Sequence, residues 1–110
     1  MLTLGIDPGL TGAFAVLDAG GALVTVADLP VMRDRKLGWI DAETFSSMLF
    51  GIANGDRMQA TVERVHAMPT NGSLAAFSQG CTLGSLLAAL QLVRAEALLI
   101  AHFAQSRTRA

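Results

Sequence analysis

The chain has 110 residues, 52% of them hydrophobic, and a formal net charge of −1. This length fits one small domain with a real core and excludes a disordered chain. The near-neutral charge gives no basic stripe of the kind that marks many nucleic-acid-binding proteins. Cys81 is the only cysteine, which excludes an internal disulfide and a cysteine-based zinc site.

The amino-terminal stretch predicts two strands joined by a tight turn, at Leu2–Asp7 and Ala13–Leu17. The first strand ends at Asp7 because Pro8 lacks an amide donor and Gly9 permits a sharp turn. No signal peptide is apparent here, and a cytoplasmic protein is expected. A carboxylate at the end of so apolar a strand either caps the turn or marks a site for a metal or a phosphate. The stretch alone favours neither.

The next stretch completes an antiparallel meander of three strands. Residues 18–21 form a hairpin turn before a third strand at Ala22–Ala27. Residues Pro30–Trp39 are polar and charged, which predicts a loop, and its basic cluster at residues 33, 35 and 36 is interpreted as a solvated surface. Asp41 is a good N-cap for a helix that runs to about Ala53, with apolar residues three and four positions apart.

A fourth strand at Met58–Glu63 ends in an acid, as the first strand does. A strand–helix–strand connection favours a right-handed crossover, which makes this strand parallel to the first. Asp7 and Glu63 are then expected at the same edge of the sheet. Ligands of open α/β sheets bind beyond the carboxyl ends of the strands, so this edge is the candidate site.

The carboxyl-terminal half predicts a loop at Arg64–Ser73 and helical structure from about Leu74. Charged residues within its long apolar run argue against a transmembrane helix. A helix over Gln91–Gln105 places Glu96 on the buried face, where a carboxylate is costly unless it is paired or binds a metal. The alternative is that Glu96 reaches water at the edge of that face. Three inward acids (Asp7, Glu63 and Glu96) can hold Mg²⁺, and two such ions about 3.5–4 Å apart support phosphodiester hydrolysis.

Three blocks of the sequence together resemble RuvC-like Holliday-junction resolvases, above all the type common in phages and prophages. The blocks are GIDPGLTGAFAVLD, then VERVHAMPTNGSLAAFSQG with LGSLLAALQ, then RAEALLIA. The resemblance covers most of the chain and implies one α/β domain of RNase H-like fold. Such a domain has a three-stranded antiparallel meander and a parallel strand, flanked by helices. It also implies cleavage of branched, four-way DNA with Mg²⁺ or Mn²⁺, in a homodimer without a membrane segment.

The resemblance also assigns roles to individual residues. Asp7, Glu63 and Glu96 match catalytic, metal-binding acids of the family. Phe77 matches an aromatic residue near the junction and could stack on a base. His66 is a candidate proton carrier or phosphate contact, and Arg64 a candidate DNA contact. As a lone histidine in a loop, His66 is otherwise simply exposed, and Phe77 is otherwise a core residue.

The chain also departs from the family pattern. A segment that includes the last strand and a basic helical stretch is expected to be missing between about residues 91 and 94. Val93 lies where relatives carry a further acid, and Cys81 lies where many carry a basic residue. Loss of positive charge predicts weaker DNA binding than in a full-length relative.

Three functional interpretations follow. The first is a metal-dependent, structure-selective endonuclease. The second is a catalytically weak or inactive remnant of such an enzyme that binds DNA or dimerises. The third, a fragment of an actin-like phosphotransferase, is remote because those enzymes need two such domains. The first requires the carboxylate of Glu96 to lie near Asp7, and their separation would leave the second.

Overall fold

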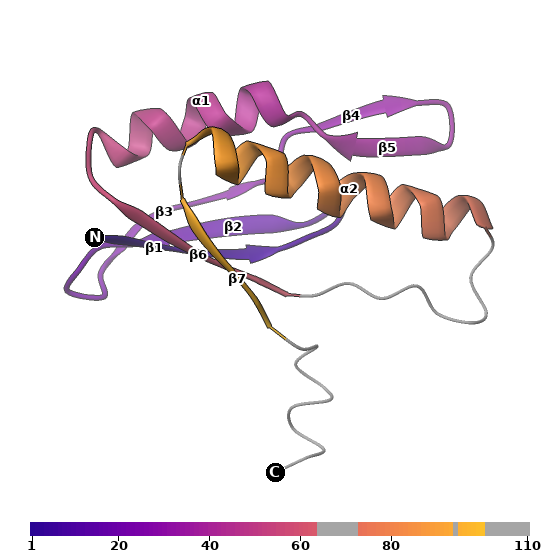
Figure 1. The fold of residues 1–110 in the computed structure, drawn as a ribbon. Coiled ribbons are helices and arrows are strands. Elements are labelled where there is room, and N and C mark those ends of the chain that lie inside the picture. The colour runs from indigo at the N-terminus through magenta and orange to yellow at the C-terminus, as the bar shows by residue number, and fades with distance from the viewer. Residues whose placement is uncertain (64–72, 94, 101–110) are drawn as a thin grey trace, which may run out of the picture.

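The computed structural model describes residues 1–63, 73–93 and 95–100 of the chain. Five strands come first, followed by a helix, a strand, a second helix and a last strand at the edge of the main sheet (Figure 1). The elements are β1 (Leu2–Asp7), β2 (Ala13–Leu17), β3 (Leu23–Asp28), β4 (Val31–Asp34), β5 (Leu37–Ile40), α1 (Ala42–Ala53), β6 (Met58–Glu63), α2 (Ser73–Leu92) and β7 (Glu96–Ile100).

The main sheet has five strands in the order β3-β2-β1-β6-β7. The first three strands form the predicted antiparallel meander. β6 pairs in parallel with β1, and β7 pairs in parallel with β6. The mixed α/β fold and the parallel placement of β6 are therefore confirmed.

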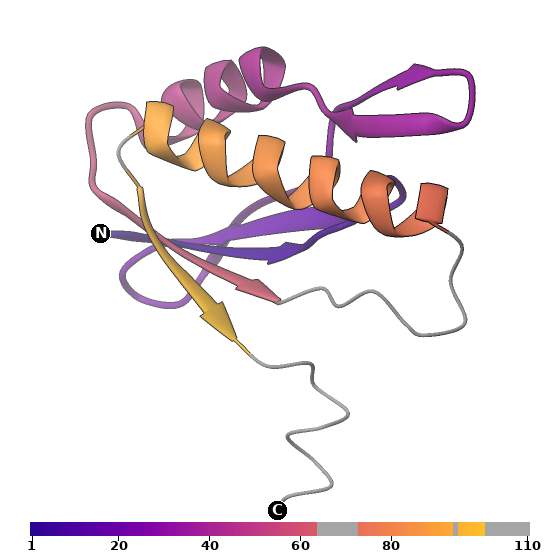
Figure 2. The ribbon, with the colours of Figure 1, turned by 45° about the vertical axis from the view of Figure 1, so that its right-hand side comes forward.

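Both helices cover one face of this sheet, and no described element covers the other (Figures 1 and 2). The alternation of side chains along the strands explains this arrangement. In β1, Leu2, Leu4 and Ile6 are buried, whereas Thr3, Gly5 and Asp7 are exposed. The core is completed by side chains of the other strands and both helices, among them Phe14, Val16, Phe45, Leu49, Val62, Leu86 and Leu90. Within it, Phe14 and Phe45 meet edge to face with ring centroids 5.0 Å apart.

Helix α1 begins and ends at the residues that the sequence indicates. The carboxylate of Asp41 accepts hydrogen bonds from the backbone N–H of Thr44 (3.1 Å) and from its hydroxyl (2.7 Å). These two bonds lower the pKa of Asp41 below its usual value. At the other end, Asn54 adopts a left-handed conformation (φ 47°), and its N–H donates to the carbonyl oxygen of Phe50. No helix in the described part of the chain is long and apolar enough to span a membrane.

The prediction of a loop over Pro30–Trp39 is wrong, because this segment forms a separate two-stranded antiparallel hairpin, β4–β5. Its turn, Arg35–Lys36, lacks the Asn-Gly or Asp-Gly pair that marks a hairpin in a sequence. The hairpin is held by contacts with α2, which local sequence does not reveal. The backbone N–H of Ile40 donates to the Ser85 hydroxyl (3.0 Å), and Ile40 itself is buried.

The helix predicted over Gln91–Gln105 is also wrong within the described residues. α2 ends at Leu92, and the chain turns through a hydrogen bond from Ala95 N–H to Leu90 C=O (3.0 Å) into β7. A run of five apolar residues fits either a strand or a buried helix. Here the segment forms a strand, because the backbone N–H and C=O groups along the free edge of β6 need hydrogen-bond partners. The last strand, which was expected to be missing, is therefore present as β7 at the edge of the sheet.

Candidate functional site

Asp7 ends β1 at the carboxyl edge of the sheet, with its side chain exposed on the uncovered face. A short turn leads back into β2, and Gly12 N–H donates to Gly9 C=O (3.1 Å) to close it. Gly12 is required here, because a Cβ at this position would overlap the backbone carbonyl oxygen of Asp7. Asp7 is therefore followed by a tight turn that needs glycine at position 12, a role that the sequence alone did not reveal.

Glu63 ends β6, the parallel neighbour of β1. The register pairs Ile6 with Val62, so Asp7 and Glu63 occupy the next position on each strand. Neighbouring strands lie about 4.8 Å apart, which places the two backbones side by side at the same edge. The predicted pairing of these acids at one edge of the sheet is therefore observed in the backbone.

Glu96 does not join them. It begins β7, where it pairs with Gln59, and the register places Ile100 beside Glu63. Four strand positions of about 3.3 Å each separate Glu96 from that edge, or roughly 13 Å along the strand. The expectation that Glu96 lies on a helix next to Asp7 is wrong, because the segment extends as a strand from the opposite end of the sheet.

Asp7 and Glu63 form a limited set of ligands. Mg²⁺ in enzymes of phosphate chemistry is often held by one or two carboxylates together with the phosphates of the substrate. The Asp7 carboxylate suits this mode because it is exposed and forms no ion pair with any described residue. Among the side chains that the structure describes, no three His, Cys, Asp or Glu residues form a group able to hold a metal. The residues present therefore fit a divalent cation shared with a phosphate, rather than a fully enclosed metal site.

Phe77 lies near the start of α2, and its side chain is 61% exposed. The alternative that Phe77 belongs to the core is thus wrong. An aromatic ring in this position is free to stack on a base. Arg64 and His66 lie outside the described residues.

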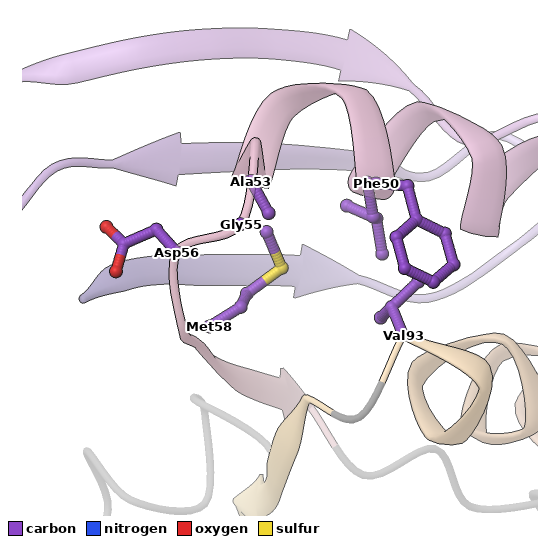
Figure 3. A pocket seen from close by; sticks show the side chains of 7 residues that line it. Phe50, Ala53, Gly55, Asp56, Met58 and Val93 are labelled. Atoms are coloured by element: carbon purple, nitrogen blue, oxygen red, sulfur yellow. The ribbon is translucent and has the colours of Figure 1, made fainter.

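A hollow of about 200 Å³ opens at the other end of the sheet, between the end of α1, the start of β6 and Val93 (Figure 3). Its lining is mainly apolar, with Phe50, Ala53 and Met58 facing it. The one charged residue there, Asp56, directs its carboxylate toward Arg57 N–H (2.7 Å) and the chain's amino terminus (3.5 Å). Because β6 runs from Met58 to Glu63, this hollow is separate from the acidic edge.

Comparison with known proteins identifies the fold. No protein-family model and no curated protein sequence matches the chain. Its structure is similar to that of RuvC from Thermus thermophilus, solved in complex with a Holliday-junction substrate, with a TM-score of 0.60 and 20% identity. The fold is that of RuvC. A second structure of T. thermophilus RuvC aligns with a TM-score of 0.55, also at 20% identity.

The alignment with RuvC is extensive for this chain and partial for RuvC. It covers 92% of the present chain and 64% of the RuvC chain in both structures. The RNase H-like architecture implied by the sequence resemblance is confirmed. At this identity the similarity establishes the fold alone, so activity, substrate and partners are matters for proposal.

Proposed function

We propose that this protein binds branched DNA at the carboxyl edge of its sheet and nicks it slowly with a divalent metal ion. It would thus be a Holliday-junction resolvase of weak catalytic activity. The observation that carries the proposal is the register of β1 and β6, which places Asp7 beside Glu63 on a RuvC fold. The displacement of Glu96 to the other end of the sheet is the reason to expect weak activity.

Asp7 and Glu63 would hold Mg²⁺ or Mn²⁺ together with the scissile phosphate. When bound, the cation would activate a water and stabilise the leaving oxygen of the phosphodiester. The two carboxylates would hold this cation at the strand ends, and the Gly12 turn fixes the backbone of Asp7. With two acids in place of three or more, part of this stabilisation is lost.

DNA contacts would come from residues around this edge. Phe77 is exposed near the start of α2 and would stack on an unpaired base at the branch point. Arg64 follows Glu63 directly in the chain, His66 lies three residues after Glu63, and both would contact phosphates. A homodimer would present two such edges to a four-way junction, so that each protomer would act on one DNA strand.

A fully active resolvase is the second candidate, and the retained Asp7–Glu63 pair favours it. A nicking assay on a synthetic four-way junction separates the candidates, because an active enzyme turns over repeatedly and a weak one cleaves slowly with enzyme in excess. Asp7→Asn removes a charged metal ligand at nearly constant size and should abolish nicking in Mg²⁺ and in Mn²⁺. Absence of cleavage by a wild-type protein that is folded by circular dichroism would leave a DNA-binding remnant without activity.

A further inference from the structure

Positive charge in the described part of the chain is concentrated at the tip of the β4–β5 hairpin. Three of its four basic residues lie there, namely Arg33, Arg35 and Lys36, and all three are exposed. None of them forms an ion pair with a described carboxylate, although Asp34 lies between them. The tip is therefore a cluster of three exposed cations against one acid.

The hairpin lies at the end of the molecule that carries Asp7. Figures 1 and 2 both show β4 and β5 extending past the carboxyl ends of β1 and β6. The chain entering the hairpin is bonded to the turn after Asp7, through Leu29 N–H and Gly12 C=O (3.0 Å). Gly38 in turn packs directly on the side chain of Leu10 in the same turn. Since Arg33 pairs with Gly38, its side chain is on the face of the hairpin that faces this turn.

The hairpin is anchored at its base and along β5, so the backbone that carries its basic residues has a defined position. Its base is closed by Asp41 N–H donating to Pro30 C=O (2.9 Å). β5 is fixed to α2 by the Ile40–Ser85 hydrogen bond and by the Ser78 hydroxyl, which donates to Gly38 C=O (3.4 Å). An unsupported two-stranded hairpin is marginally stable in water, and these contacts supply its support.

The turn of the hairpin holds a charged residue, Arg35, in a strained backbone conformation. Arg35 adopts φ 58°, a left-handed conformation that glycine accepts readily and other residues resist. Residues held in such conformations cluster at functional sites. The strain and the charge lie in the same residue, and a glycine would remove both.

We propose that the β4–β5 hairpin is a phosphate-binding arm that grips one duplex arm of the branched DNA through Arg33, Arg35 and Lys36. This rests on the proposed function, whose substrate contacts it extends. At about 3.3 Å per residue, the cations lie roughly 13–20 Å beyond Leu29 along the hairpin. Duplex DNA rises about 3.4 Å per base pair, so they would meet phosphates some four to six steps from the one nearest Leu29.

The test is the salt dependence of binding to a synthetic four-way junction without divalent metal. The triple variant R33Q/R35G/K36Q is compared with wild type and with Arg57→Gln, a control that removes a cation at the opposite end of the sheet. Each lost phosphate contact should reduce the slope of log K against log salt by about 0.9, so the triple variant should lose about 2.7. Arg35→Gly alone relieves the turn, should melt no earlier than wild type, and should lose about 0.9.

The outcomes separate the inference from the function on which it rests. Wild-type slopes in the triple variant and in Arg35→Gly, with junction binding intact, would overturn the arm and leave the proposed function standing. A loss of slope in Arg57→Gln equal to that in Arg35→Gly would also overturn it, because each removes one cation and the effect would then be one of net charge. Failure of the wild-type protein to bind the junction would overturn both.

Discussion

Substitution of Gly12 by alanine tests whether the turn after β1 positions Asp7. The added methyl group would fall well inside van der Waals contact with the Asp7 carbonyl oxygen. Carbon and oxygen normally approach no closer than about 3.3 Å, so the backbone must shift by about 1 Å or more. The oxygen belongs to the main chain and cannot rotate away. The substitution therefore moves the residue that would hold the metal.

The expected magnitudes follow from this displacement. Overpacking of this kind costs about 1–3 kcal/mol of folding stability. A domain with about 5–15 kcal/mol of stability remains folded after such a loss, so activity can still be measured. Misplacing a catalytic group by about 1 Å lowers the rate roughly 100-fold. The rate of nicking of a four-way junction should therefore fall roughly 100-fold. The small loss of folded protein would not account for a fall of this size.

Gly5→Ala is the matched control. It makes the same change within β1, two residues before Asp7, and its Cβ would have no atom within 4 Å. Its urea denaturation midpoint should equal or slightly exceed that of wild type, because glycine weakens a strand interior. Its nicking rate should equal that of wild type. Equal nicking by wild type and Gly12→Ala, at equal stability, would refute the role assigned to the turn.

Two further predictions concern the stability of the fold. Asp41→Ala should lower the melting temperature at pH 7 because it removes the N-cap of α1, whereas Asp41→Asn should retain most of the stability. Since the folded state lowers the pKa of Asp41, its contribution is present above the usual carboxyl pKa and is lost as pH falls through the folded value. The difference between wild type and Asp41→Asn should therefore shrink in acid, and a difference that grows there would contradict this account. Phe14→Ala should cost about 3–5 kcal/mol in urea denaturation, because Phe14 is only 1% exposed and packs edge to face on Phe45. A loss below about 1 kcal/mol would show that the core is packed differently.

Local sequence signals predicted four of the five strands of the main sheet, β1, β2, β3 and β6. Alternating side chains, Pro8 and Gly9, and the Asp41 cap each act over a few residues, and the structure places β1, β2, β6 and α1 accordingly. The pairing of Asp7 with Glu63 also followed, because it needs only strand type and a right-handed crossover.

The errors fall where distant contacts decide the local structure. The β4–β5 hairpin depends on Ser85 and Leu10, which lie far from it in the chain. Residues Glu96–Ile100 fit either a strand or a buried helix by sequence, and pairing with the open edge of β6 makes them a strand. The candidate site lost Glu96 for this reason. The basic cluster of the hairpin was interpreted as a solvated surface because the sequence gives no indication that the hairpin is attached to the turn after Asp7.

Cleavage of a four-way junction at increasing Mn²⁺ concentration tests the central claim most directly. The Asp7–Glu63 account predicts slow nicking by the wild-type protein that saturates with Mn²⁺. It also predicts loss of nicking in Asp7→Asn and Glu63→Gln, with the wild-type rate retained in Glu96→Gln. Nicking that survives Asp7→Asn, or that disappears in Glu96→Gln with the fold intact, would contradict the assignment of the site to the carboxyl ends of β1 and β6.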